Sequence, residues 1–147
     1  MPTRSARTAW TGGLQDGSGQ VELTSSGVGT YDVSFPKRAA DDADGATSPE
    51  ELIAGAHSAC YAMSLSNLVT EAGGTVHSLD VTADVTLGPD KEAGGFKLTR
   101  IKLTARGEVE GLDEAGFKDA AEKAKAGCPI SKALAAVDIT LDAALES

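Results

Sequence analysis

Two cysteines, Cys60 and Cys128, carry the strongest potential nucleophiles of this chain. A thiol reacts only as its thiolate, and a free cysteine titrates near ~8.5, so each position needs a group that stabilises the anion. Cys128 directly precedes Pro129, which predicts that it caps a short helix, where free backbone N–H groups and the helix dipole favour an anion. Cys60 falls inside a predicted long helix, where the dipole gives little help, so it needs a cation from elsewhere.

Arg38 and Glu50 are the candidates for that cation and its partner. Arg38 lies in a polar segment ahead of the helix, and its guanidinium stays charged and holds its donors in a rigid fork. Glu50 can orient this guanidinium and offset its desolvation. Glu50 and Cys60 are ten residues apart on one helix, which is about 15 Å along the axis and about 80° around it. They cannot touch within one straight helix, so either Arg38 bridges the gap or a second copy of the chain supplies the carboxylate.

The long helix that must position these residues is predicted over residues 49–72. Ser48, Pro49 and Glu51 form a capping box with proline at the first helical position, and Gly73 with Gly74 can end the helix. Its surface is apolar nearly all round, which is typical of a helix buried on most sides. One small domain can hardly cover such a rod, so we expect a partner subunit, with the helix packed antiparallel against its copy across a two-fold axis.

The remaining elements complete a predicted α+β fold in one domain, residues 1–147. Short alternating strands fill the first 36 residues, with Phe35 in the last of them, and a polar loop follows over residues 36–47. Two further strands follow the helix, and their alternation slips between Leu98 and Ile101, which predicts a bulge. The predicted helices over 113–126 and 129–136, and a strand over 137–145, complete the chain.

Composition excludes several classes of function. The formal net charge of −9 and the sequence pI of about 4.6 argue against nucleic acid and against anionic membrane surfaces, because both require clustered cations. The sequence has no apolar run long enough to span a membrane and no apolar signal core near Met1. Two cysteines do not make a disulfide-scaffolded secreted domain. We therefore expect a soluble cytoplasmic protein, in which a cysteine pair serves reactivity.

Three segments carry a resemblance to a known family. Residues 48–60, SPEELIAGAHSAC, resemble the central-helix motif of the OsmC/Ohr family of organic hydroperoxide reductases, and residues 124–131, AKAGCPIS, resemble its second cysteine motif. Arg38, ahead of the helix, is similar to the arginine of the OsmC branch, the osmotically inducible type. The order of elements agrees as well, so the resemblance covers essentially the whole chain.

The resemblance implies a fold, a reaction and a set of roles. The fold would be antiparallel sheets wrapped around long central helices in an intertwined homodimer, with two sites at the interface. The reaction would be reduction of organic hydroperoxides, and less well of hydrogen peroxide. Cys60 would form a sulfenic acid, which Cys128 would convert to a disulfide. Arg38 would lower the pKa of Cys60 and polarise the peroxide, and Glu50 would hold Arg38. An external dithiol of the dihydrolipoyl kind would reduce the disulfide, with no metal, haem or flavin.

Other interpretations of the same residues remain open at this point. The chain could be a non-catalytic module that binds a hydrophobic ligand, or a redox sensor whose disulfide changes a partner interaction. His57 and Cys60 have a spacing that could ligate a metal, but two ligands do not make a site, so a packed or hydrogen-bonded His57 is favoured. The acidic loop that contains Asp42 and Asp44 has Ala40 where a calcium loop needs its first ligand, which argues against calcium.

Overall fold

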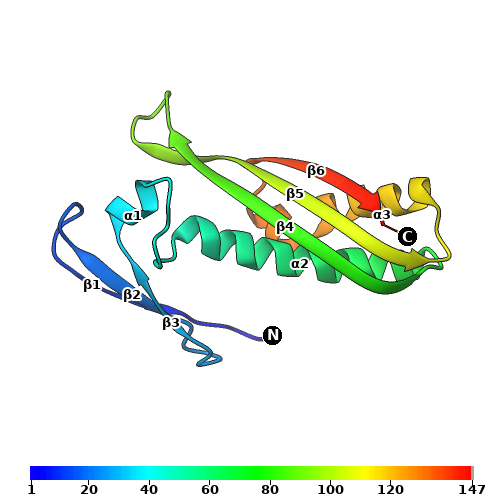
Figure 1. Ribbon diagram of the computed structural model, residues 1–147, viewed down its shortest axis with the longest axis horizontal. Coiled ribbons are helices and arrows are strands. Elements are labelled where there is room, and N and C mark those ends of the chain that lie inside the picture. Colours follow the sequence, from blue (N-terminus) through cyan, green and yellow to red (C-terminus); the bar gives the residue numbers. More distant parts are fainter. Residues whose placement is uncertain (147) are drawn as a thin grey trace. The chain divides into compact units, whose positions relative to one another are not determined.

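The computed structural model describes residues 1–146, which form two compact units divided after Leu52. Each unit contains one three-stranded sheet (Figure 1). The long helix α2, Pro49–Glu71, begins in the first unit and continues into the second. None of the helices in the described part of the chain is long and apolar enough to cross a membrane.

The first unit is an antiparallel meander followed by one helical turn. Its strands are β1, Arg7–Thr11, β2, Ser18–Glu22, and β3, Thr30–Val33, paired in sequence order. The prediction of a strand through Phe35 and a loop after it was wrong, because helix α1, Phe35–Ala39, begins there. The Ser34 hydroxyl accepts the Lys37 N–H at 3.3 Å, and this N-cap together with an early proline starts the turn. Arg38 therefore lies on a helical turn.

Helix α2 begins as its capping signals predict and ends one residue earlier than expected. The Ser48 hydroxyl accepts the Glu51 N–H at 3.1 Å. A stripe of every fourth residue is fully buried, namely His57, Tyr61, Leu65 and Val69. Other apolar residues of the helix stay accessible in the single chain, with Met63 73% exposed. One chain thus buries one face of α2, in keeping with the expectation that a single domain cannot cover it, and the second copy that would cover the rest remains a prediction.

The second unit is a mixed sheet covered on one face by helices. Strands β4, Thr75–Pro89, and β5, Phe96–Glu110, form a long antiparallel hairpin, and β6, Asp138–Leu145, pairs with β5 in parallel. Helix α3, Glu114–Gly127, and helix α4, Pro129–Ala133, form the crossover to β6. Helices α2 and α3 lie on the same face of this sheet (Figure 1). The buried core forms where they meet it.

The α+β class is confirmed, but the expectation of antiparallel sheets is wrong for the second unit, because the helical crossover brings β6 beside β5 in parallel. The predicted bulge is present at Thr99, because Leu87 pairs with Leu98 while Thr86 pairs with Arg100. Helix α4 is shorter than predicted. Beyond Ala133 the α-helical pattern stops, because the Ala135 N–H donates to the carbonyl oxygen three residues back, at 3.4 Å, and not to the one four residues back. The chain then turns toward β6.

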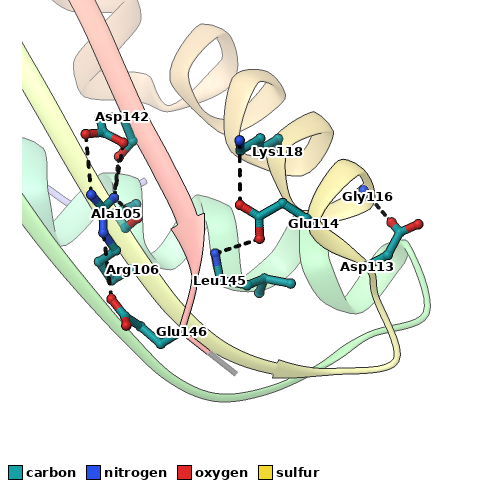
Figure 2. Close-up of polar contacts among 9 residues, drawn as sticks. All are labelled: Ala105, Arg106, Asp113, Glu114, Gly116, Lys118, Asp142, Leu145 and Glu146. Atoms are coloured by element: carbon teal, nitrogen blue, oxygen red, sulfur yellow. Dashed lines mark hydrogen bonds and ion pairs between the residues drawn. The ribbon is translucent and has the colours of Figure 1, made fainter.

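An ion cluster fastens β6 to its neighbours (Figure 2). Arg106 on β5 meets Asp142 with two contacts of 3.3 Å and lies 3.7 Å from Glu146. The Glu114 carboxylate, at the start of α3, accepts the Leu145 N–H at 3.1 Å. Hydrogen bonds and the charge of Arg106 hold the pKa of Asp142 below its ordinary value. The cluster thus ties the outer strand to both the sheet and α3.

Replacing Arg106 by methionine should lower the melting temperature by a few degrees at neutral pH, in keeping with exposed ion pairs. A carboxyl whose pKa is depressed by folding stabilises the fold above its unfolded pKa of about 3.9 and loses that contribution as pH falls through the folded pKa. The difference between wild type and variant should therefore shrink below pH about 4. Thermal melts by circular dichroism across this range test it, and a difference that stays constant with pH would contradict the assignment to Asp142.

Candidate functional site

The two cysteines meet between α2 and α4. The Cys60 and Cys128 sulfurs lie 2.8 Å apart and share a hydrogen bond, and both residues are free thiols. Helix α3 ends at Gly127 and α4 begins at Pro129, so Cys128 lies between them with non-helical backbone (φ −58°, ψ 130°), at the N-cap position of α4. The change of direction at this position brings the second cysteine motif to the long helix, so the expected cysteine pair does form.

The two sulfurs differ in access and in acidity. Cys128 is fully buried, whereas Cys60 is partly exposed. Burial raises the pKa of Cys60, and its hydrogen bond with Cys128 adds to that rise. Burial also acts to raise the pKa of Cys128, but the Cys60 thiol and the N–H groups of Ser131 and Ile130 outweigh it and lower this pKa. When the pair loses one proton within this unit, the remaining proton therefore stays on Cys60.

Arg38 and Glu50 form the second predicted pair, inside the first unit. The guanidinium Nη2 lies 2.7 Å from Glu50 Oε1, and Nε donates to the two carboxylate oxygens at 3.0 and 3.2 Å. Glu50 is buried and Arg38 is one-third exposed. This bidentate geometry fixes the plane of the guanidinium and leaves Nη1 for another partner. The two pairs belong to different units, and their union in one site remains a prediction.

A cavity of about 380 Å³ lies in the first unit, with Arg38 in its wall. Its lining is mainly apolar and includes Trp10, Leu14, Phe35 and Leu52. Sequence reasoning did not identify these residues as a site. The available signal was Trp10, the single tryptophan of a chain with few aromatics. The cavity can hold an apolar group beside a guanidinium.

His57 is hydrogen-bonded and fully buried, as the sequence favoured. Its Nε2 lies 2.7 Å from the Ser131 hydroxyl, a partner that sequence reasoning did not identify. Ser131 belongs to the second cysteine motif, so the motif itself was the available signal. Within residues 1–146, no three His, Cys, Asp or Glu side chains gather in a way that could hold a metal ion.

A paired, partly accessible dithiol in an α+β fold of two sheets and a long helix defines a class of thiol-based redox proteins. The family model described as OsmC-like protein matches residues 41–142. The chain is 41% identical over 144 residues to Peroxiredoxin OsmC of Escherichia coli, which covers 98% of this chain and 97% of that protein. The chain therefore belongs to the OsmC-like family.

Solved structures agree with this assignment over nearly the full length. An organic hydroperoxide resistance protein from Elizabethkingia anophelis, with thiocyanate bound, is 30% identical, with a TM-score of 0.79 and coverage of 99% of this chain and 98% of that one. An organic hydroperoxide resistance protein OsmC from Legionella pneumophila is 28% identical, with a TM-score of 0.77 and coverage of 98% of each chain. The fold is thus that of OsmC and of organic hydroperoxide resistance proteins.

Proposed function

We propose that this chain is a cysteine-based peroxidase that reduces organic hydroperoxides, and hydrogen peroxide less well, to alcohols or water at the expense of an external dithiol. The observation that carries the proposal is the pair of free thiols 2.8 Å apart. The 41% identity to a peroxiredoxin of the family supports it. A protein that only binds an apolar ligand has no need of such a pair.

Access makes Cys60 the attacking sulfur. Cys128 is fully buried and cannot meet a substrate, whereas Cys60 is partly exposed. The surroundings of the pair favour the anion on Cys128, so Cys60 needs an additional positive charge. Arg38, held in place by Glu50, supplies that charge in this proposal. The proton of the pair then moves across the sulfur–sulfur hydrogen bond to Cys128.

The cycle has three balanced steps. The Cys60 thiolate attacks the terminal oxygen of the hydroperoxide, the O–O bond breaks, and the alkoxide takes the proton held by Cys128 and leaves as alcohol, so that Cys128 becomes a thiolate. Cys128, as thiolate, then attacks the sulfur of the Cys60 sulfenic acid, which forms the disulfide and releases hydroxide that is protonated to water. A dithiol, of which a dihydrolipoyl group is one example, reduces the disulfide by exchange and is itself oxidised to its disulfide. No cofactor takes part.

The cavity of the first unit indicates which substrates fit. Its lining places apolar side chains next to Arg38, so the guanidinium can bind the peroxide oxygens while the alkyl or aryl group fills the cavity. Hydrogen peroxide lacks that group and gains nothing from the cavity. The exposed apolar side chains of α2, including Met63, support a homodimer in which a second copy covers this helix. A cytoplasmic location is part of the same proposal.

The function is tested by steady-state turnover with a dithiol and a series of peroxides. We expect a kcat/KM at least tenfold higher for cumene hydroperoxide than for hydrogen peroxide, because a methylene-sized apolar contact contributes roughly tenfold or more to specificity. Light scattering on the same sample tests the dimer. Absence of dithiol-dependent turnover with every peroxide would leave the binding module or the redox sensor as the better interpretation.

Trp10→Ala should raise KM for cumene hydroperoxide about tenfold and leave the rate with hydrogen peroxide nearly unchanged, since Trp10 lines the cavity and is 43% exposed. Tyr31→Ala is the matched control, because Tyr31 is a similarly exposed aromatic residue of the same unit that does not line this cavity. Equal effects of Trp10→Ala on both peroxides would argue against a role of the cavity in substrate choice.

A further inference from the structure

His57 and Ser131 form a second contact between α2 and α4, next to the contact of the two cysteines. His57 precedes Cys60 by three residues on α2, and Ser131 follows Cys128 by three residues at α4. Residues three apart on a helix share a face. The His57 Nε2–Ser131 Oγ contact of 2.7 Å and the sulfur contact of 2.8 Å therefore join the same two elements side by side.

Helix α4 is a short element that the His57–Ser131 hydrogen bond joins to α2. It is a single turn of five residues, all of them described, and Ser131 is the one that is buried. The other partner in the contact, His57, has no exposed surface. Leu134 at the end of α4 packs against the core, and the Ile130 N–H contacts Cys60. The Ser131–His57 bond is the buried side-chain hydrogen bond that adds to these contacts in setting the position of α4. The bond is also costly to break, because it would leave two buried polar groups unsatisfied.

The tautomer of His57 follows from its second ring nitrogen. Within the described residues 1–146, the buried Nδ1 makes no hydrogen bond. Burial lowers the pKa of His57, so the ring is neutral and carries one proton. A buried N–H without an acceptor is rarer than an acceptor without a donor, so the proton belongs on Nε2. His57 thus donates to the Ser131 oxygen, and the Ser131 hydroxyl proton stays free to turn toward Cys128, whose pKa that hydroxyl helps to lower.

We propose that His57 and Ser131 are positioning residues that hold α4, and with it the Cys128 sulfur, within attacking distance of Cys60. The step they serve is attack of the Cys128 thiolate on the Cys60 sulfur, which forms the S–S bond while the group on Cys60 leaves with its electron pair. In the peroxidase cycle that group is hydroxide, so this role rests on the proposed function. The same attack also occurs when any other leaving group occupies Cys60. The positioning role can therefore be tested separately from the peroxidase function.

An aryl disulfide that releases a coloured nitrothiophenolate tests the attack without peroxide. Cys60 first displaces one nitrothiophenolate and keeps the other as a mixed disulfide. Cys128 then attacks the Cys60 sulfur and releases the second. For Ser131→Ala and His57→Leu we expect an unchanged first release and a second release slowed ten- to hundredfold, the size of effect that a misplacement of about 1 Å produces. Ser131→Thr and His57→Gln, which retain a hydroxyl and a donor, should recover most of the rate.

Two controls separate positioning from general loss of stability. Val69→Ala removes buried volume from the same face of α2, three turns further along, and should leave both releases unchanged. The double variant Ser131→Ala/His57→Leu should be no slower than either single variant, because both break one contact. A second release unaffected by Ser131→Ala, or slowed equally by Val69→Ala, would overturn the proposal.

Two further measurements complete the test. Nitrogen NMR of wild-type protein needs no variant to fold, and it should report the Nε2–H tautomer for His57; the Nδ1–H tautomer would overturn the orientation argued above. One equivalent of cumene hydroperoxide should produce the disulfide in wild type, more slowly in Ser131→Ala. Wild-type protein that completes both releases with the aryl disulfide but ignores the peroxide would refute the proposed function and leave the positioning role intact.

Discussion

Cys60→Ser is expected to abolish peroxide turnover, with a fall in kcat/KM of at least about a thousandfold. A serine hydroxyl is far less acidic than a thiol and cannot pass through the sulfenic acid and disulfide states. Cys60 is also the member of the pair that solvent reaches. The measurement is consumption of cumene hydroperoxide with a dithiol in excess, on protein whose fold has been checked by circular dichroism.

Cys128→Ser is the informative counterpart of this substitution. It removes the attacking group of the second step and leaves the first, so one equivalent of peroxide should yield a sulfenic acid at Cys60 that a cyclic diketone traps as a mass adduct. Turnover with a dithiol-specific reductant should be strongly reduced. The outcome against the assignment is the reverse one, in which Cys60→Ser protein forms a trappable sulfenic acid at Cys128. The lowered pKa of Cys128 favours Cys128 as the attacking residue, whereas its complete burial opposes it.

Arg38→Met is expected to lower kcat/KM about a hundredfold, comparable with the loss of one donor at a developing negative charge. Burial and the Cys128 thiol raise the pKa of Cys60, and in the proposed site Arg38 is the group that offsets this rise. A thiol with a raised pKa is protonated at neutral pH and becomes reactive as pH rises, so the loss should be largest near pH 7 and partly recover above pH about 9. The rate of alkylation of Cys60 by iodoacetamide as a function of pH measures this directly.

Glu50→Gln and Lys37→Met are the companion variants for the Arg38→Met experiment. Glu50→Gln retains one oxygen for the guanidinium but loses the charge and the bidentate geometry, so we expect a smaller loss, about tenfold. Lys37→Met removes an exposed cation from the same helical turn, where Lys37 contacts Asp44, and should change neither rate. If Lys37→Met and Arg38→Met shift the alkylation profile equally, net charge and not Arg38 governs the acidity of Cys60.

The parts of the fold that local signals determine were predictable from the sequence. The capping residues at Ser48 and Glu51 define the start of α2, and a slip in alternation locates the bulge near Thr99. The Arg38–Glu50 ion pair was also expected, because two complementary charges flank the start of one helix. In each case the information lies in the same short stretch of sequence as the feature, twelve residues at most for Arg38 and Glu50.

Features that depend on distant partners were not predictable. Alternation in β6 indicates a strand but not its direction, and its parallel pairing with β5 depends on the crossover through α3 and α4. The hydrogen-bond partner of Ser131 is His57, which lies 74 residues earlier in the sequence. The end of β3 was mispredicted for a local reason, because Phe35 continues the apolar alternation of β3 while the Ser34 cap starts a helix there. The cavity at Trp10 combines residues from several segments of the first unit.

The parallel pairing of β6 has a consequence for the order of events during synthesis. Cys128 lies in the crossover between β5 and β6, and a parallel pair cannot form until its whole crossover has been made. Closing so long a segment is slow compared with forming a hairpin such as β4–β5. Because Cys60 precedes Cys128 by 68 residues, a growing chain contains Cys60 before the crossover that carries Cys128 has been made. Under the proposed function, a Cys60 that is oxidised before the crossover has folded has no internal thiol with which to form the disulfide.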